Sequence, residues 1–451
     1  MKTQLTLISL TLIASLNAAD NWPQFRGPGA LGVSENTNLP EKWSAKENVL
    51  WKRDIAGRGW ASPVVWGKRV FLTTAVSEGK TEEARKGLYF GGERRRSSTS
   101  IHHWKVICLD LDTGEVLWKK TARSGRPQGS IHIKNSYASE TPITDGERVY
   151  AYFGNHGLYC YSVEGKQLWK KEWPAYKTRY SWGLAASPVL HKGRLYIVND
   201  NEEQSFLVAL DAKTGKEVWR VKREEKSNWS TPYIWENKLR TEIITPGTKK
   251  NRAYDLNGRL LYQFGGNSSI TIATPYAKFG LLYVTSGYVG DRKKPMFAIR
   301  PGAKGDISLK SDKDSNEFVA WCQRRAGPYN PSTITYGDLM YVLLDRGLVA
   351  RYEAKTGKHV FGPERIVPRG GAFTSSPWAY NGRVFFLDEN GVTYVLQAGR
   401  KFKLLPANRL NAKEDMCMAT PAMSGDKLII RTDARVYCFK KAEEASGSKF
   451  K

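Results

Sequence analysis

A proline that opens the same short phrase recurs along most of the chain. The spacings between successive copies are 79, 46, 44, 43, 56, 46 and 44 residues. Most copies follow a serine or threonine, and each precedes a β-rich run with a glycine turn, as in residues 377–387. A period of this size predicts the blades of a propeller rather than a series of unrelated domains. The series is Pro63, Pro142, Pro188, Pro232, Pro275, Pro331, Pro377 and Pro421.

Each repeat contains the pattern of two hairpins. The first hairpin turns at a dipeptide such as Asp145-Gly146 or Asn381-Gly382, whose residues accept positive φ. The second reads strand, Thr-Gly turn, strand and aromatic residue, most clearly at residues 108–118 and 209–219. The runs between the turns are rich in Val, Tyr, Phe and Ile, as strands require. Two hairpins per repeat predict a four-stranded antiparallel blade.

The two ends of the repeat region complement each other. Eight prolines predict eight blades, but after Pro421 only three strands fit, the last ending at Phe439. Residues 48–53 precede the first blade and resemble the outer strand of the others. Pairing this strand with the last blade would close the ring and remove an exposed sheet edge. The sequence therefore predicts an all-β fold, an eight-bladed β-propeller closed by its N-terminal strand.

The chain begins with the features of an exported protein. Lys2 precedes an apolar stretch, and small residues follow before Asp20, so residues 1–19 are interpreted as a signal peptide. The apolar run is too short for a membrane span, and a hydrophobic first strand is the alternative. The predicted organisation is a lead segment at 20–46, one propeller at 47–440 and a basic, polar tail at 441–451. The mature protein is expected to be periplasmic or extracellular, with no membrane span.

The five cysteines are mostly explained by one position of the repeat. Aligning the third strand of each unit gives a column of small residues, with Val395 as the bulkier exception. Cysteine there is interpreted as a small buried hydrophobe; a metal site or disulfides are the alternatives. Cys322 and Cys417 fall outside the column. Its small members are Cys108, Cys160, Ala209, Ala253, Ala298, Ala350 and Cys438.

The phrase Ala-x-Asp-x-x-Thr-Gly-x-x-x-Trp, nearly complete at 209–219 and 108–118, resembles the docking motif of the PQQ-type repeat. Two families share that repeat. Quinoprotein alcohol dehydrogenases hold pyrroloquinoline quinone (PQQ) and Ca²⁺ on the axis of an eight-bladed propeller, whereas BamB-like proteins are cofactor-free scaffolds of the bacterial envelope. The segment 21–28 also resembles the start of many exported PQQ-repeat proteins. The resemblance implies that the docking residues pack blade against blade; they are Trp51, Trp118, Trp169, Trp219, Tyr262 and Phe361.

Motifs that would indicate catalysis are missing from the sequence. It has no His-Glu-x-x-His, Cys-x-x-Cys, Gly-x-Ser-x-Gly or P-loop pattern, so neither a catalytic residue nor a metal site is predicted. His102 and His103 would point to opposite faces of a strand. The quinoprotein resemblance implies adjacent cysteines beside the cofactor, and the chain has none. Weak candidates for cofactor binding are Arg58, Glu140, Trp182, Asn228, Trp229 and Arg369.

The chain is strongly basic, with 70 Lys and Arg against 44 Asp and Glu, a net charge of +26. Two insertions, at 75–104 and 287–316, carry much of the clustered charge. The basic residues form either a solvated surface or a site for a polyanion, such as acidic polysaccharide, anionic lipid head groups or an acidic protein. Nucleic acid is disfavoured because no dedicated motif is present. The polyanion candidates are Arg94, Arg95, Arg96, Lys249, Lys250, Arg292, Lys293 and Lys294.

The residues before each proline enter the innermost strand and should gather around one mouth of the channel. They form a ligand site of converging aromatic and polar groups, or else wedges between blades. We expect an exported, non-catalytic and monomeric binding or assembly scaffold, without a cofactor, whose partner is an envelope protein or an anionic polymer. The alternatives are a PQQ- and Ca²⁺-dependent dehydrogenase of alcohols or sugars, and a carbohydrate-binding propeller. The mouth residues are Arg58, Trp60, Tyr137, Glu140, Tyr180, Trp182, Asn228, Trp229, Tyr329, Asn330, Arg369 and Phe373.

Overall fold

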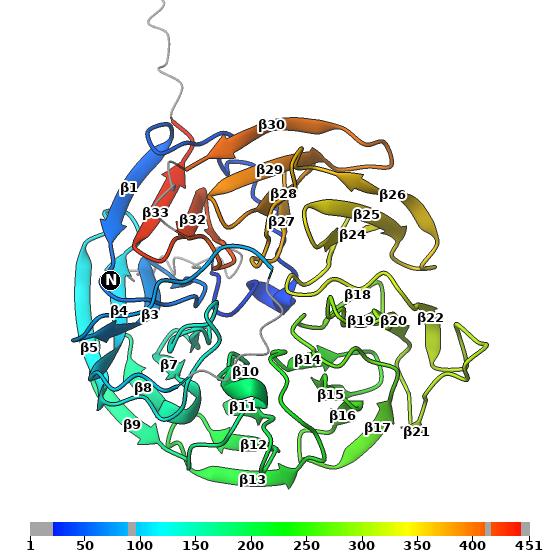
Figure 1. Cartoon of the computed structure of the whole chain (residues 1–451), viewed down its shortest axis with the longest axis horizontal. Coiled ribbons are helices and arrows are strands. Elements are labelled where there is room, and N and C mark those ends of the chain that lie inside the picture. The colour runs from blue at the N-terminus through cyan, green and yellow to red at the C-terminus, as the bar shows by residue number, and fades with distance from the viewer. Residues whose placement is uncertain (1–20, 89–95, 411–415, 443–451) are drawn as a thin grey trace, which may run out of the picture.

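Eight antiparallel sheets stand around a central axis in the computed structural model of the protein, which describes residues 21–88, 96–410 and 416–442. Figure 1 shows the sheets as the blades of one closed ring. The predicted eight-bladed propeller with four-stranded antiparallel blades is therefore confirmed. The predicted signal peptide, Arg94, Arg95 and most of the predicted tail lie outside the described residues.

The first four blades follow one another along the chain, each built from the axis outward. Their strands are β2 Val64–Trp66, β3 Arg69–Ser77, β4 His102–Asp110 and β5 Val116–Gly125; β6 Ile143–Thr144, β7 Arg148–Tyr152, β8 Leu158–Ser162 and β9 Gln167–Lys171; β10 Val189–His191, β11 Arg194–Asn199, β12 Phe206–Asp211 and β13 Glu217–Lys222; and β14 Tyr233–Glu236, β15 Thr241–Thr245, β16 Asn251–Tyr254 and β17 Leu260–Phe264.

The other four blades complete the ring. Their strands are β18 Tyr276–Lys278, β19 Leu281–Thr285, β20 Met296–Ile299 and β22 Val319–Gln323; β23 Ile334–Tyr336, β24 Leu339–Leu344, β25 Leu348–Glu353 and β26 His359–Arg365; β27 Trp378–Tyr380, β28 Arg383–Leu387, β29 Val392–Gln397 and β30 Leu404–Arg409; and β31 Ala422–Ser424, β32 Lys427–Arg431 and β33 Arg435–Lys440, joined by β1 Val49–Asp54. The helices of the described chain are single 3-10 turns, far from the length of a membrane span: η2 Pro28–Ala30, η3 Gly154–His156 and η4 Arg179–Ser181.

The ring closes through β1, as predicted. This strand pairs antiparallel with β33, with Trp51 opposite Cys438. The Trp51 indole lies over Gly114 of the first blade, and its Nε1 donates a hydrogen bond to the Leu111 carbonyl at 2.9 Å. The N-terminal strand thus supplies both the missing outer strand and the contact between the last blade and the first.

The same tryptophan–glycine contact joins the first blades of the ring. Each indole covers the glycine of the Thr-Gly or equivalent turn in the next blade. A Cβ at these glycines would lie between 2.5 and 3.0 Å from the nearest indole atom, and each glycine has positive φ. Both conditions favour glycine, since a side chain would clash and be strained. The pairs are Trp51–Gly114, Trp118–Gly165, Trp169–Gly215 and Trp219–Gly258.

The docking contact changes in the later blades. Trp321 of β22, absent from the sequence prediction, covers Gly357 and donates to the Ala354 carbonyl at 3.1 Å. Tyr262 is buried opposite Ala253. Phe361 stacks on Phe402 with ring centroids 5.7 Å apart. Tyr262 in blade four and Phe361 in blade six therefore replace the docking tryptophan by other aromatic packing. Blade five keeps the tryptophan–glycine contact through Trp321.

The column of small residues lies opposite the docking residues. Cys108, Cys160 and Cys438 face Trp118, Trp169 and Trp51 across the outer pair of strands, and all three cysteines are fully buried. None of the five cysteines forms a disulfide. The interpretation of these cysteines as small buried hydrophobes is confirmed by this packing.

Hydroxyl groups before strand one link neighbouring blades around most of the axis. In six pairs a backbone N–H donates to the Ser or Thr side chain at the equivalent position of the following blade, over 2.9–3.1 Å. In the other blades the linking Ser or Thr directly precedes the repeated proline. In blade six it is Ser332, which directly follows Pro331. The linked pairs are Ser62–Thr141, Thr141–Ser187, Ser187–Thr231, Thr274–Ser332, Ser332–Ser376 and Ser376–Thr420.

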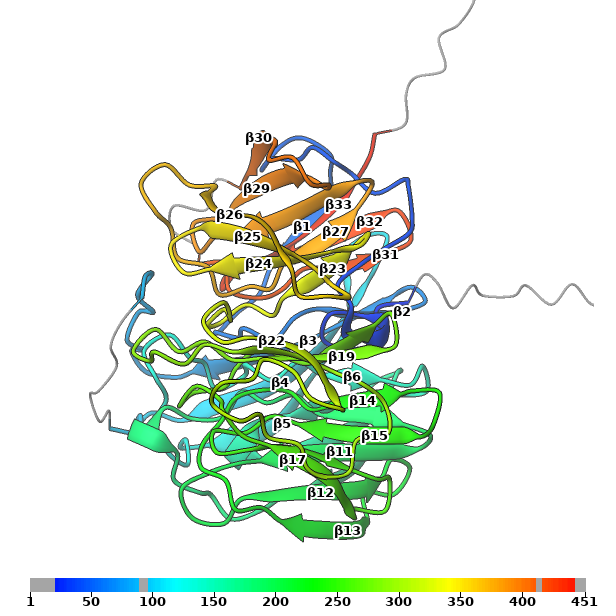
Figure 2. The ribbon, with the colours of Figure 1, turned by 90° about the vertical axis from the view of Figure 1, so that its right-hand side faces the viewer.

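The lead segment crosses one face of the ring, on the side of the turns between the first and second strands. Trp22 forms a bridge with Val65, and Val33 with Ala379. Arg26 is fully buried; its guanidinium donates to the Thr333 carbonyl at 2.8 Å and lies over the Tyr276 ring. Figure 2 shows this segment on the opposite side of the disc from the long connection that follows β3.

The two predicted insertions differ from their expected bounds. In blade one the paired strands β3 and β4 include residues 75–77 and 102–104, so the connection itself is 78–101. In blade five, β20 lies inside the predicted insertion at 287–316. The additional chain after β20 forms β21 Gly305–Asp306, which pairs in parallel with β17 of blade four. Blade four consequently has a fifth, outermost strand.

Candidate functional site

A cavity of about 220 Å³ lies on the axis of the ring. Phe25 of the lead segment closes one end, and Gly87 and Leu88 of the blade-one connection reach the other. Hydroxyls of the inter-blade links, such as Ser187 and Thr231, form part of the wall. Of the predicted mouth residues, the cavity brings together Trp60, Trp182, Trp229, Tyr329 and Asn330.

The aromatic side chains of this cavity contact one another. Trp182 and Trp229 lie with ring centroids 5.8 Å apart, and Trp229 donates from Nε1 to the Gly183 carbonyl at 2.8 Å. The Nε1 groups of Trp60 and Trp182 have no hydrogen-bond partner among the described residues. Tyr180, which contacts Trp182, has a φ of 52°, a left-handed conformation that is strained for tyrosine. The aromatic wall is thus tightly packed, and its two unpartnered Nε1 groups are buried within it.

An ion pair holds the blade-one connection over this cavity. Lys134 and Glu389 are in contact, with side-chain exposures of 10% and 1%. The Lys134 ammonium donates to the Gly87 carbonyl at 2.6 Å, and the Gly87 N–H donates to Glu389 Oε2 at 2.8 Å. Thr374 also donates to Glu389. Because both backbone groups of Gly87 are bound, this part of the connection is anchored to blades at both sides.

A second, larger cavity of about 680 Å³ lies beneath the same connection. Arg58, Lys80 and Arg96 line it together with Asp433 and Glu82. Arg58 donates to the Glu82 carbonyl at 2.8 Å, and partial burial lowers its pKa from the ordinary value. The structure therefore places Arg58 and Arg96 in one cavity, although the sequence assigned them to different sites.

Glu140 occupies a separate, small cavity of about 20 Å³ beside Phe153 and Gly154. Burial raises the pKa of this carboxyl to about 8, because only the backbone N–H groups of Ser139 and Glu140 itself favour the ionised form. Glu140 is 3% exposed. Without a bound cation, its carboxyl thus favours the neutral form.

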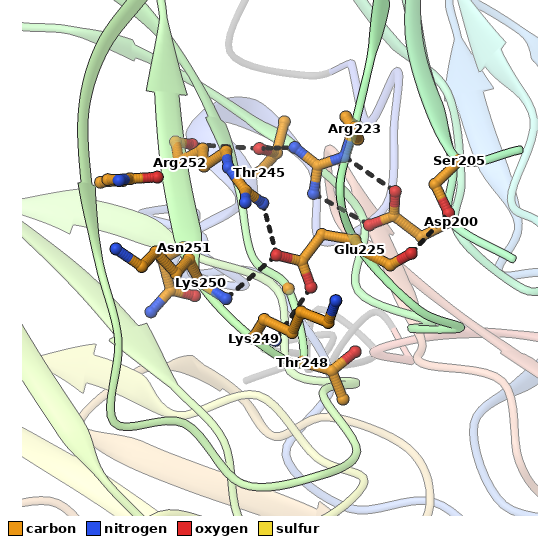
Figure 3. Close-up of polar contacts among 12 residues, drawn as sticks. Asp200, Ser205, Arg223, Glu225, Thr245, Thr248, Lys249, Lys250, Asn251 and Arg252 are labelled. Carbon is orange, nitrogen blue, oxygen red and sulfur yellow. Dashed lines mark hydrogen bonds and ion pairs between the residues drawn. The ribbon is translucent and has the colours of Figure 1, made fainter. Parts of the chain in front are cut away.

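Asn228 belongs to a buried polar network between blades three and four. Figure 3 shows other members of this network, including Asp200, Arg223 and Glu225. Arg223 donates to both carboxylate oxygens of Asp200, at 2.8 and 2.9 Å, and the Asn228 amide donates to the same carboxylate. Burial opposes the charge of Arg223, but Asp200 raises the pKa of Arg223 above its ordinary value. The Asn228 amide is committed to this network, and it does not meet Glu140 in one cavity.

The same network absorbs part of the predicted polyanion site. Glu225 accepts hydrogen bonds from the backbone N–H groups of Lys249 and Lys250 and forms an ion pair with Arg252. The Lys250 ammonium pairs with Asp306 of β21. The charges of Lys250 and Arg252 are therefore paired, whereas Lys249 contributes only its backbone N–H to the network.

The remaining predicted residues are scattered over the surface. Arg292 and Lys293 are exposed and Lys294 is half-buried, its backbone bridged to Arg325. Arg369 is exposed and does not line the axial cavity. Of its loop, Thr374 lines that cavity. His102 and His103 contact different partners, and no three His, Cys, Asp or Glu side chains of the described chain form a metal-binding group.

Sequence reasoning missed the ion pair that anchors the connection. Lys134 and Glu389 are far apart in the chain and belong to no repeated phrase, so only the ring geometry brings them together. Trp321 was missed because the connection containing β21 separates it from the rest of its repeat. The Ser and Thr residues were visible as a repeated Ser/Thr-Pro phrase, but their role in linking blades follows only from the structure.

Blade count, strand order and the docking contacts define a propeller of the PQQ-repeat class. The family model described as "Outer membrane protein assembly factor BamB" matches residues 101–178 and 154–447, more than half of the chain. The protein belongs to this family. No curated protein matches the chain.

Solved structures of two functional kinds share the fold. BamB from Moraxella catarrhalis is 12% identical, with a TM-score of 0.52, over 83% of this chain and 99% of that one. A europium-containing methanol dehydrogenase is 11% identical, with a TM-score of 0.61, over 94% and 98%. The quinohemoprotein alcohol dehydrogenase from Comamonas testosteroni is 13% identical, with a TM-score of 0.57, over 96% and 82%. At these identities the likeness concerns the fold alone.

Proposed function

We propose that the protein is an exported, non-catalytic binding or assembly scaffold of the bacterial envelope. The family match over residues 101–178 and 154–447 carries this proposal, because the matching model describes an outer-membrane assembly factor. Fold alone does not decide between scaffold and enzyme, so the site must. The envelope location is supported by the N-terminal segment interpreted as a signal peptide.

The residues that a PQQ–Ca²⁺ site would need do not fit that group. Glu140 is enclosed in its own small cavity and favours its neutral form. The Asn228 amide is bound to Asp200, which in turn neutralises Arg223. Recruiting Asn228 to a cation would break its buried contact with Asp200, which is costly, and Glu140 lies in a different cavity. This favours the scaffold over the dehydrogenase alternative.

Photo-cross-linking in cells tests the scaffold proposal. A photoreactive amino acid replaces Leu117 on β5, Tyr180 at the cavity mouth or Leu239 in a turn, each of them at least 41% exposed. We expect the protein in the envelope fraction and a discrete adduct with one envelope protein from at least one position. A fully buried position, Tyr196, serves as the negative control. Cytoplasmic fractionation without any adduct would refute the proposal.

A further inference from the structure

We propose that the 680 Å³ cavity beneath the blade-one connection binds an oligosaccharide that carries carboxylate or sulfate groups. The proposal goes beyond the scaffold function and does not depend on it. It rests on the size of the cavity, the three basic side chains that line it, its hydroxyl-rich wall and the aromatic cavity beside it.

The size and construction of the cavity suit a ligand of several sugar rings. Its volume lies within the range of about 300–1,000 Å³ that is typical of ligand pockets. The walls come from the segment after β1, the end of β3, both described arms of the connection and the segment at 131–137. The bonds of Gly87 to Lys134 and Glu389 anchor the first arm five residues beyond the part that lines this cavity, residues 79–82.

Positive charge in this region exceeds negative charge. Arg58 has Asp433 and Glu83 as counter-charges, and the fully buried Arg431, which does not line the cavity, also has Asp433. That carboxylate also accepts the Met416 N–H at 2.8 Å. Asp433 thus serves two guanidinium groups, of which only Arg58 lines the cavity.

Two further cations line the outer part. Lys80 and Arg96 are exposed, and neither forms an ion pair within the described residues. Cations that converge on a cavity and lack partners attract anionic ligands and form charge-assisted hydrogen bonds with carboxylate or sulfate oxygens. The cavity therefore favours an anion over a neutral ligand.

Hydroxyl groups distinguish an oligosaccharide from other anions. The side chains of 97–100 are Ser, Ser, Thr and Ser, and Ser77, Thr81 and Ser136 face the same cavity. Hydroxyls donate and accept, which matches the hydroxyls of a sugar. An acidic polypeptide presents mainly carboxylates and carbonyls, so it would leave much of this donor and acceptor capacity unused.

The aromatic cavity on the axis adjoins the basic one. His132 and Asn135 line both, and His132 contacts Trp182 edge-on with ring centroids 5.0 Å apart. Aromatic faces pack against the apolar face of a pyranose ring, and Trp60, Trp182 and Trp229 supply such faces in the axial cavity. One end of a bound oligosaccharide can thus extend from the basic cavity toward the aromatic wall.

Titration calorimetry at physiological salt tests the proposal on the mature protein. The probes are an oligogalacturonate for carboxylate, a dextran sulfate oligosaccharide of equal length for sulfate, neutral dextran, and polyglutamate. We expect one or both anionic sugars to bind at least tenfold more tightly than neutral dextran. Comparing the two anionic sugars identifies the acidic group.

Paired charge removals locate the binding. Lys80→Gln with Arg96→Gln should weaken binding about tenfold, since two charge-assisted contacts are lost. The control Lys119→Gln with Lys120→Gln removes the same charge from exposed positions of β5 outside the cavity and should change affinity less than twofold. Melting temperatures confirm that both variants are folded.

Four results would overturn the proposal: no binding of either anionic sugar, equal binding of neutral dextran, equal loss in both double variants, or polyglutamate binding as tightly with the same dependence on Lys80 and Arg96. The last result would assign the cavity to an acidic polypeptide. A failed cross-linking experiment would leave the cavity proposal intact, so the two proposals fail separately.

Discussion

At the residue scale, the contacts between blades depend on indole rings that lie on glycines. Trp219 covers Gly258 and donates from Nε1 to the Leu256 carbonyl at 3.0 Å. Val218, its neighbour on β13, points to the other side and is 46% exposed. Adjacent residues of one strand therefore contribute very differently to stability, which is a consequence of the alternation along a strand.

We expect Trp219→Ala to lower the free energy of unfolding by about 3 kcal/mol, because it leaves a cavity and removes one of the two hydrogen bonds to the Leu256 carbonyl. Val218→Ala is the matched control and should cost less than about 0.5 kcal/mol. Chemical denaturation of both variants measures the difference. Similar losses would contradict the docking role. Trp66 is unsuitable as a control, since it lies against Gly146 of the next blade.

The buried Glu140 carboxyl gives a pH dependence with a defined sign. Its pKa is raised to about 8 in the folded protein, from an ordinary value of 4.5. Between these values the folded state holds a proton that the unfolded state has lost, so its contribution to stability falls as pH rises from about 4.5 to 8. Glu140→Gln should remove this loss, worth a few kcal/mol. Unfolding curves at both ends of this range, for both proteins, measure it; an unchanged pH dependence would show that Glu140 is already ionised.

At the scale of elements, the repeat made most of the fold predictable from sequence. The hairpins around Gly382 and the Thr-Gly turn at residues 214–215 determine strand order locally, and the incomplete last blade predicts the pairing of β1 with β33. The prediction of strand positions failed at the segment inserted after β20. β21 joins the edge of blade four, and neither its pairing nor the position of Trp321 can be read from the interrupted spacing.

Ring closure by β1 can be tested by deletion. A chain that begins after Ile55 loses β1, the Trp51 contact and the lead segment, so the β33 edge and the buried surface of blade eight become exposed. We expect aggregation and a clearly lower melting temperature. Deletion of residues 443–451 is the control and should have little effect. A monomeric deletion variant with the original melting temperature would refute the closure.

At the scale of the whole molecule, the ring brings together residues that the sequence keeps apart. Ser and Thr side chains link the blades around the axis, and the Lys134–Glu389 pair anchors the blade-one connection above it. The sequence indicated a mouth of aromatic residues, and the structure divides that mouth into an aromatic, a basic and a small acidic cavity. Such a division depends on loop conformations that no repeat pattern encodes.

The claim that this propeller binds without oxidising a substrate is tested most directly with PQQ. The mature protein is titrated with PQQ and Ca²⁺ by calorimetry and then assayed for dye reduction over a panel of alcohols and sugars. Because Glu140 and Asn228 are committed to separate buried contacts, we predict neither one-to-one binding nor PQQ-dependent dye reduction. Tight one-to-one binding with dye reduction, abolished by Glu140→Gln or Asn228→Ala, would contradict the account and identify a quinoprotein dehydrogenase.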